Sequence, residues 1–384
     1  MACCTGPDGG NTLKTGPLHC GQRTILMFAF DPTFWRDRRV FVTGHTGFKG
    51  AWLVLWLTAL GARLTGFSLP PYTSPSLFAL CGQGRGTDLY GDVADQALVA
   101  RALADCEPEI VIHMAAQALV RPSYAEPLAT YATNVMGTAN VLQAARFAPS
   151  VRAVVVVTSD KVYENDGAGR PFTEDDRLGG HDPYSSSKAC AELVTNSFRR
   201  CFFDGACRIA TARAGNVIGG GDWSPFRVVH DIVAAFEAGQ PVALRYPQAV
   251  RPWQHVLDPL AGYLMLAQAM VSDPTSAPAA LNFAPDAESF RPVSELVEAL
   301  SSCWGGRPGW RSDTGEHPHE ATLLTLDATR ARELLSWRPL LAFDDAVTWT
   351  ADWYRAFWNG EDVGAVTHWQ IDAFSERIGQ RPGN

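Results

Sequence analysis

The sequence predicts an α/β fold in which a doubly wound, mostly parallel sheet is joined to a smaller mixed C-terminal lobe. Between residues 38 and 217, short apolar segments alternate with amphipathic ones, and strands that alternate with helices form βαβ units around a parallel sheet. After the stretch GGGDW at 219–223 this alternation weakens, and short helices, short strands and many Pro and Trp residues follow. The change in pattern indicates the start of the smaller lobe.

Each expected element has a simple signal in the sequence. Apolar runs rich in β-branched residues predict strands at 38–44, 63–69, 109–116, 154–157 and 207–217. Apolar residues at helical spacing predict helices, and Gly61 and Pro108 end the first two. The helices are expected at 50–62, 95–108, 134–147, 184–200, 228–238, 259–271 and 293–303. The four valines at 154–157 show no polar alternation, which indicates a central strand buried on both faces.

The composition bounds the class of protein. With 384 residues, 46% of them hydrophobic and 19% charged, the chain can form a large core, which excludes global disorder. A net charge of −8 excludes a general nucleic-acid or membrane-surface binder. No apolar run approaches the ~18 residues of a membrane span, and residues 1–33 lack the apolar centre of a secretion signal. We therefore expect a cytoplasmic protein with a flexible N-terminal extension at 1–33.

The cysteines and histidines give no sign of a metal site. The nine cysteines are scattered, with no CxxC pair, so we expect reduced and inert thiols. Cys201 and Cys207 have a spacing that would allow a disulfide, and this alternative stays open. His317, His319 and Glu320 form a cluster, but no further ligand set lies at metal spacing, so we expect no metal and a substrate-side or structural role.

A glycine-rich loop, TGHTGFKG at 43–50, lies between the first expected strand and the first helix. In this context Gly44 permits a tight turn, Gly47 lets a pyrophosphate approach the backbone, and Gly50 lets the helix pack on the strand. The helix N-terminus also offers free N–H groups to phosphates. The loop therefore predicts a Rossmann-type dinucleotide site, and a tight turn without a ligand is the alternative. Further contacts are expected from Thr46, Phe48 and Lys49.

The acidic residue that usually holds the ribose of NAD is missing from the end of the second strand. Ser68 is the nearest hydroxyl there, so the choice between NAD and NADP stays open from the residues alone. Asp92, after a short strand, is either an acceptor for the adenine amine or a surface cap. The nicotinamide side is expected to be lined by Ala115, Ala116 and Gln117.

Polar side chains follow the valine strand directly, namely Thr158, Ser159, Asp160 and Lys161. The carboxyl end of a central parallel strand is where such folds bind ligands, which indicates a functional site. A local ion pair between Asp160 and Lys161 is the alternative.

Tyr184 and Lys188 lie four residues apart on an expected helix and therefore share a face. A neighbouring ammonium lowers the pKa of a phenol, so we expect Lys188 to make Tyr184 a usable base for oxidation of a hydroxyl. Lys188 is also placed to hold the ribose of the cofactor. A surface lysine near a capping tyrosine is the alternative.

Together these motifs resemble those of the extended short-chain dehydrogenase/reductase family, and within it the CDP-glucose branch of the sugar-nucleotide 4,6-dehydratases. The similarity runs from about residue 34 to 345, and its most specific stretches are TGHTGFKG, TSDKVY, GNVIGGGDW and RPWQHVL. The resemblance implies a lyase with bound NAD that oxidises C4 of the hexose, removes water across C5 and C6, and returns hydride to C6. The implied product is a precursor for deoxysugars of lipopolysaccharide or another surface polysaccharide.

The same resemblance implies a role for each catalytic residue. Tyr184 takes the proton of the 4-hydroxyl, Ser159 bonds to O4, and Asp160 is the acid for the departing 6-hydroxyl. Lysine at 161 matches the CDP-glucose branch, whereas dehydratases that act on dTDP-glucose carry Glu there. Lys161 is therefore either the base at C5, if desolvation lowers its pKa, or a group that stabilises the C5 enolate.

For the nucleotide sugar, the resemblance implies contacts from Arg121, Asn216, Arg251 and His255. The fork of donors on arginine suits a diphosphate, and Trp253 either stacks on a base or packs. The resemblance also implies that 34–222, with returning segments of the C-terminal half, binds the dinucleotide. Residues 223–384 then mainly bind the nucleotide sugar.

Other functions stay open at this stage. A 4-epimerase of the same fold would share Tyr184 and Lys188 without needing Asp160, and a non-catalytic NAD-binding protein would need none of the three. A dehydratase for another nucleotide sugar is also open, because CDP rests on the resemblance. Family members often pair through helices, so we expect a homodimer or higher homo-oligomer, with seams such as 138–147 and 191–200.

Overall fold

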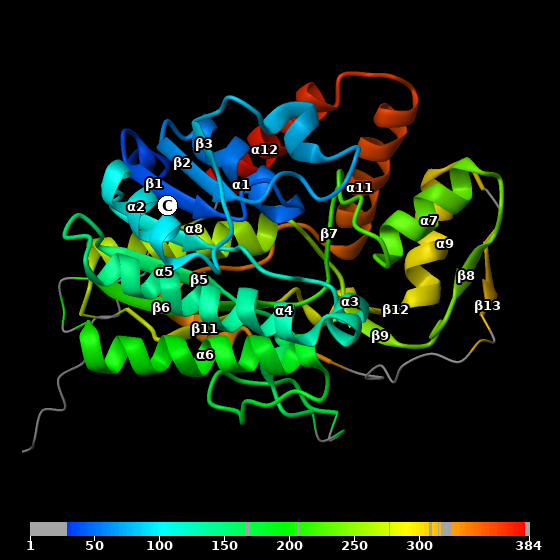
Figure 1. The fold of residues 1–384 in the computed structure, drawn as a ribbon. Helices are drawn as coiled ribbons and strands as arrows, with labels where there is room; N and C mark the ends of the chain where they lie inside the picture. Colours follow the sequence, from blue (N-terminus) through cyan, green and yellow to red (C-terminus); the bar gives the residue numbers. More distant parts are fainter. Residues whose placement is uncertain are drawn as a thin grey trace, which may run out of the picture.

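The computed structural model describes residues 29–380, except for 166, 168, 204, 206, 276, 307, 308, 314 and 316–323. Seven parallel strands form the central sheet, in the order β11-β6-β5-β4-β1-β2-β3. Helices lie on both faces of this sheet (Figure 1). The arrangement confirms the predicted doubly wound α/β fold.

The elements predicted from the sequence are present, with ends that shift by a few residues. The first half of the chain forms β1 (Arg39–Thr43), α1 (Phe48–Ala59), β2 (Arg63–Ser68), β3 (Thr87–Tyr90), α2 (Gln96–Cys106), β4 (Ile110–His113), α3 (Val120–Ala125), α4 (Pro127–Tyr131), α5 (Gly137–Arg146), β5 (Ala153–Val157) and α6 (Pro183–Phe202). The second half forms β6 (Arg208–Ala214), β7 (Val217–Ile218), α7 (Val228–Glu237), β8 (Val242–Leu244), β9 (Val250–Pro252), β10 (Gln254–His255), α8 (Leu257–Ser272), β11 (Ala280–Phe283), β12 (Phe290–Pro292), α9 (Val293–Cys303), β13 (Trp310–Ser312), α10 (Thr329–Leu335), α11 (Phe343–Trp358) and α12 (Val363–Gly379).

The valine strand β5 lies in the interior of the sheet, between β4 and β6. Val154 and Val156 belong to the core on the side of α2 and α5, whereas Val155 and Val157 belong to the core on the side of α1 and α8. Because both faces are covered by helices, every position of the strand is apolar. Polar residues therefore begin only where the strand leaves the sheet.

The second half of the chain contributes to both parts of the molecule. The pairings β8–β13 and β9–β12 lie with α7 and α9 in a smaller unit, on the right of Figure 1. By contrast, β11 extends the central sheet beside β6, and α8 packs against β5 and β6. Strand β11 therefore forms one edge of the sheet, and α8 covers part of one face.

The chain joins the packed fold before residue 34. Phe30 is only 6% exposed, and the Gln268 side chain accepts from Asp31 N at 3.0 Å and donates to Ala29 O at 2.9 Å. Residues 29–33 are thus held by an apolar anchor and two hydrogen bonds, which corrects the predicted extent of the flexible extension. Residues 1–28 lie outside the described residues. Within the described part, no helix is long and apolar enough to cross a membrane.

Candidate active site

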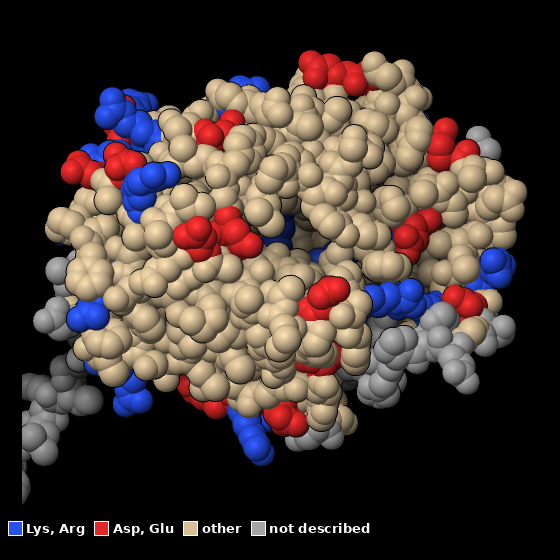
Figure 2. Space-filling view, viewed as in Figure 1, with Lys and Arg blue, Asp and Glu red and all other residues tan. Residues whose placement is uncertain are grey.

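The carboxyl ends of β1, β4 and β5 bring the predicted residues to one edge of the sheet. Because these strands are parallel neighbours, the glycine loop, residues 115–117 and Ser159–Lys161 all emerge on the same side. Helix α6 begins there and adds Tyr184 and Lys188. Figure 2 shows a hollow in this view of the molecule, with Lys or Arg side chains inside it. Local positive charge of this kind suits an anionic ligand despite the net charge of −8.

The glycine loop has the geometry that a dinucleotide requires. Gly44 has a φ of +75°, and a Cβ there would lie 2.7 Å from Ala115 N, so a larger residue would be strained and crowded. A Cβ on Gly50 would collide with the Gly44 carbonyl. Gly47 caps α1 without a side-chain hydrogen bond, so no cap side chain competes for the first N–H groups of the helix. These features fit the pyrophosphate of a dinucleotide.

Hydroxyl groups, and no carboxylate, occupy the end of β2. The Thr46 hydroxyl donates to Leu69 O at 2.9 Å and lies 2.9 Å from Ser68 Oγ. Asp92 follows the edge strand β3 and accepts a hydrogen bond from Ala94 N at 2.9 Å. This contact is that of a turn, and the position of β3 at the edge of the sheet places Asp92 several strands away from Ser159 and Asp160.

Side-chain hydrogen bonds fix the segment that follows β4. The Thr43 hydroxyl accepts from Ala115 N at 3.1 Å, and Asn134 both accepts from Gln117 N at 2.8 Å and donates to Gln117 O at 3.0 Å. His113 is buried 2.7 Å from Thr43 Oγ1, and burial lowers its pKa to about 3. His113 is therefore a neutral packing residue that holds this segment in place.

Asp160 is a buried carboxyl group beside Ser159. Its Oδ1 accepts a hydrogen bond from Ser159 Oγ at 2.9 Å, and its Oδ2 has no hydrogen-bond partner among the described residues. Burial raises the pKa of Asp160, although Lys161, Ser159 and Arg251 act in the opposite direction. A Cβ on Gly215 would collide with this carboxylate, so glycine leaves the space that Asp160 needs. No ion pair joins Asp160 to Lys161 in the described structure, which disfavours a purely structural pair.

Tyr184 and Lys188 are both buried near the start of α6. Burial raises the pKa of Tyr184, and the nearby Ser159 side chain opposes this rise. The prediction that Lys188 lowers the pKa of Tyr184 is wrong for the protein alone, because the Lys188 Nζ donates to Val157 O at 3.2 Å and desolvation of the phenol dominates. The pKa of Lys188 is itself lowered to about 8 by burial and by Lys49.

Lys49 lies close enough to Asp160 and Lys188 to interact with their charges, although its sequence position predicts only a cofactor contact. Its Nζ donates to the Tyr263 hydroxyl at 3.4 Å, and burial lowers its pKa to about 8, against the opposing charge of Asp160. The rarity of lysine in the sequence is the signal that could have assigned Lys49 to this site. Only four of the 32 basic residues are lysines, at positions 14, 49, 161 and 188. Three of these four lysines, Lys49, Lys161 and Lys188, lie in this site.

Among the residues predicted to bind substrate, Arg251 lies near enough to Asp160 to act on its charge, and Asn216 follows Gly215, which faces the Asp160 carboxylate. Arg251, on β9, lowers the pKa of Asp160 by its charge. Asn216 precedes β7, and its carbonyl accepts a hydrogen bond from Gln254 N at 3.3 Å. Arg121, on α3, lies over the Phe226 ring at 5.1 Å from its centroid.

The structure contradicts the prediction that His255 binds substrate. The His255 ring has no exposed surface and packs edge-on against Trp52 and Trp349, at centroid distances of 5.7 and 5.6 Å. Burial lowers the pKa of His255 to about 3. Trp253 is also buried and donates to Arg291 O at 3.0 Å, so it packs. Strand β10 points His255 into the core, which its closeness to Arg251 in sequence could not show.

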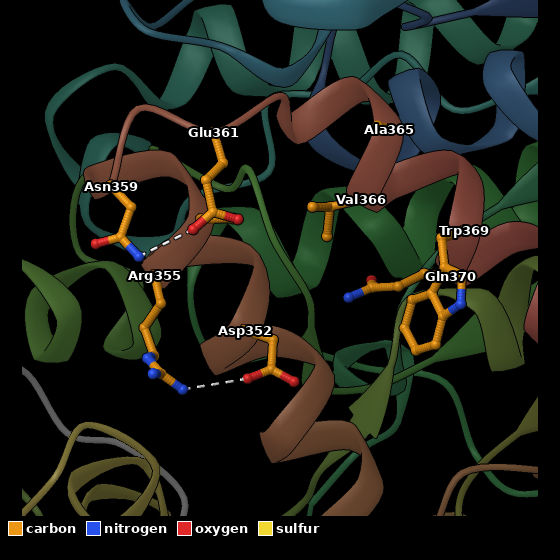
Figure 3. Close-up of a pocket in the computed structure, with 9 residues that line it drawn as sticks. Asp352, Arg355, Asn359, Glu361, Ala365, Val366, Trp369 and Gln370 are labelled. Atoms are coloured by element: carbon orange, nitrogen blue, oxygen red, sulfur yellow. Dashed lines mark hydrogen bonds and ion pairs between the residues drawn. The ribbon is translucent and has the colours of Figure 1, made fainter.

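The other candidate features lie apart from this site. A surface groove of about 470 Å³ between α11 and α12 shares no lining residue with it, and its wall carries an ion pair between Asp352 and Arg355 at 3.5 Å (Figure 3). In the described ranges no three His, Cys, Asp or Glu side chains gather to hold a metal ion. Cys201 and Cys207 are both free thiols. The predicted cluster of His317, His319 and Glu320 lies outside the described residues.

The chain is similar to known nucleotide-sugar dehydratases over most of its length. A family model described as GDP-mannose 4,6 dehydratase matches residues 41–350. The CDP-glucose 4,6-dehydratase of Salmonella typhimurium is 44% identical over 343 residues, which cover 87% of this chain and 95% of that protein. A dTDP-glucose 4,6-dehydratase of Xanthomonas campestris is 27% identical over 82% of this chain and 92% of that protein.

The fold is also similar to that of a solved nucleotide-sugar dehydratase. A dTDP-glucose 4,6-dehydratase from Streptomyces venezuelae, solved with NAD bound, superposes with a TM-score of 0.73 at 26% identity, covering 83% of this chain and 98% of that one. Because the family model and the Salmonella relative both match most of the sequence, the chain belongs to the GDP-mannose 4,6 dehydratase family, and the predicted resemblance to sugar-nucleotide 4,6-dehydratases is confirmed.

Proposed function

We propose that this chain is an NAD-dependent lyase that converts CDP-glucose to CDP-4-keto-6-deoxyglucose by oxidation at C4, loss of water across C5 and C6, and reduction at C6. The observation that carries the proposal is the buried Asp160 carboxyl beside Ser159, with its raised pKa. A dehydratase needs a group that keeps a proton for the departing hydroxyl, whereas a 4-epimerase does not. The similarity to the Salmonella enzyme supports CDP as the nucleotide.

The bound cofactor supplies the oxidant for C4 and the reductant for C6. We assign its pyrophosphate to the loop from Gly44 to Gly50, where the strained glycine and the helix N-terminus fit a phosphate. Lys188 is assigned to the ribose near the nicotinamide and residues 115–117 to the ring. Asp92 is assigned to the adenine. The NAD-bound Streptomyces relative supports NAD rather than NADP.

Ser159 and Tyr184 act on the 4-hydroxyl group. Ser159 lies near enough to Tyr184 to lower the pKa of its phenol against the effect of burial. The two side chains therefore form one path along which the C4 proton leaves as the hydroxyl is oxidised. Both are buried, which keeps water from competing for this path.

Asp160 and Lys161 act at C6 and C5. Asp160 gives its proton to the 6-hydroxyl as water leaves, and its Oδ2, which has no hydrogen-bond partner in the described structure, is the atom that carries this proton. Lys161 follows Asp160 directly and is partly buried. We assign Lys161 to C5, where its amine takes the proton that C5 loses as water leaves C6.

The substrate diphosphate is assigned to the side of the site that faces the smaller unit. Arg251 comes from β9 of that unit and acts electrostatically on Asp160. Asn216 and Arg121 complete the proposed set. We propose that 34–222 with the returning segments holds the dinucleotide, and that 223–384 mainly holds the nucleotide sugar.

A homodimer or higher homo-oligomer is also proposed. Leu128 on α4, Met136 just before α5 and Leu193 on α6 are 83%, 56% and 56% exposed. These helices pack against one another (Figure 1), so the exposed side chains belong to one helical layer that a second copy is suited to cover. Sedimentation of the purified protein measures this directly.

The cysteines support a reducing compartment, and we propose the cytoplasm and synthesis of a surface-polysaccharide precursor. The six described cysteines are free thiols, and burial raises the pKa of Cys207 to about 12. Thiols of this kind are inert and need no oxidising environment.

The direct test offers CDP-, dTDP-, GDP- and UDP-hexoses to the purified protein and follows the 4-keto product by its absorbance in strong alkali. Conversion of CDP-glucose with NAD that copurifies is the expected result. Formation of an epimer without a 4-keto product would instead support a 4-epimerase, and conversion of another nucleotide sugar would correct the nucleotide.

A further inference from the structure

A buried ion pair lies beneath the catalytic segment, and none of the proposed steps uses it. Arg213 on β6 donates to both carboxylate oxygens of Glu192 on α6, with Nε–Oε1 at 2.9 Å and Nη2–Oε2 at 2.7 Å. Their side chains are 5% and 4% exposed. A buried pair is a poor source of stability, because desolvation of the two charges offsets their attraction. The role of the pair is better explained by the side chains that it holds in position through hydrogen bonds.

The pair holds both ends of the catalytic segment. Thr158, directly before Ser159, donates to Glu192 Oε1 at 2.5 Å. Tyr163, after Lys161, accepts from Arg213 Nη1 at 2.7 Å and donates to Asn282 Oδ1 at 2.7 Å. Four residues lie between these anchors, and the first three of them, Ser159 to Lys161, are those assigned to the chemistry.

The same carboxylate also connects the segment to α6. Glu192 lies four residues, or about one helical turn, after Lys188, and two turns after Tyr184. The bond from Thr158 therefore fixes the end of β5 against the helix that carries the other two catalytic side chains. A shift of this contact moves Ser159 relative to Tyr184.

We propose that the Glu192–Arg213 pair is the positioning group of the active site. Through Thr158 it sets the position of Ser159 relative to Tyr184, and through Tyr163 it sets the positions of Asp160 and Lys161. Neither member of the pair is assigned a contact with substrate. The inference rests on the proposed function, because the segment it positions is the one assigned to oxidation and water loss.

The chain offers a matched control for this idea. Thr211, on β6, donates to Glu192 Oε2 at 2.7 Å, is buried like Thr158, and lies outside the catalytic segment. Thr158→Val and Thr211→Val therefore remove the same kind of hydrogen bond from the same carboxylate. Both are expected to lower the unfolding temperature by similar amounts. Only Thr158→Val is expected to lower kcat, by about tenfold or more, with KM within about threefold. Thr158→Ser, which keeps the hydroxyl, is expected to restore activity.

A variant at the second anchor, Tyr163, is expected to change the kinetics in a different way. Tyr163→Phe removes only the hydroxyl that meets Arg213 and Asn282, so it should slow water loss more than oxidation. The expected sign is reduced cofactor that accumulates on the enzyme during turnover and is measured by absorbance. Thr158→Val should show no such accumulation, because it disturbs oxidation first.

Equal loss of activity in Thr158→Val and Thr211→Val would overturn the positioning role, and so would wild-type kcat in both Thr158→Val and Tyr163→Phe. If Thr158→Val fails to fold, the comparison of Tyr163→Phe with Thr211→Val decides in the same way. Wild-type protein that converts no nucleotide sugar refutes the proposed function instead, so the two failures are distinguishable.

Discussion

Asp160→Asn is expected to slow turnover and at the same time to stabilise the fold. Burial raises the pKa of Asp160 from 3.8, so the native state holds this proton more tightly than the unfolded chain does. The resulting stability is fully present below the unfolded pKa and is lost as the pH rises through the folded pKa. The loss amounts to about 1.4 kcal/mol for each unit by which the pKa is raised. The amide of Asn does not ionise, so the variant does not lose this stability as the pH rises.

The stability of the variant is therefore expected to depend on pH in a defined way. Asp160→Asn should unfold at a higher temperature than wild type at about pH 8, and the advantage should shrink as the pH falls toward the unfolded pKa of 3.8. Differential scanning calorimetry at several pH values measures the effect. A variant that is less stable than wild type at about pH 8 would contradict the cost of ionising this buried group.

The same variant should block water loss. General acids contribute about 10²- to 10⁴-fold to rate, so formation of the 4-keto product should fall by that factor. Oxidation at C4 does not use this proton, so single-turnover absorbance should show reduced cofactor that persists. Turnover equal to that of wild type would refute the role assigned to Asp160.

Three further predictions follow from the glycine loop and the two buried lysines of the site. Gly44→Ala should cost about 1–3 kcal/mol of stability, because it imposes a φ of +75° on alanine beside Ala115. The same variant should no longer copurify with NAD. A variant that retains NAD would contradict the assignment of this loop to the cofactor. Lys49→Arg should lower kcat by about tenfold, because the larger head does not fit beside Tyr263, and wild-type kcat would show that any cation suffices. Turnover should decline above about pH 8, where Lys188 loses its proton, and a pH–rate profile that stays flat would contradict a role for its charge.

The sheet could be predicted from the sequence because its signals are local and strong. Four consecutive valines require cover on both faces, and a glycine loop between a strand and a helix is typical of a dinucleotide site. The same reasoning placed Ser159 and Asp160 at the mouth of the site, since polar residues that follow a buried strand must leave the sheet at its carboxyl edge.

The contacts that depend on distant parts of the chain could not be predicted. His255 follows Arg251 in sequence, but the pleat of β9 and β10 and the tryptophans of α1 and α11 decide which way it points. Glu192 lies on helix α6 and its partner Arg213 lies 21 residues away on strand β6, and no spacing rule connects them. The pKa of Tyr184 likewise depends on burial, which helix periodicity alone does not measure.

The central claim is that one molecule of substrate loses hydride at C4 and regains it at C6 on the same enzyme. CDP-glucose labelled with deuterium at C4 tests this directly when the product is examined by NMR or mass spectrometry. The expected product is CDP-4-keto-6-deoxyglucose with deuterium at C6. Deuterium that returns to C4 in an epimer, or a product without the label, would contradict it.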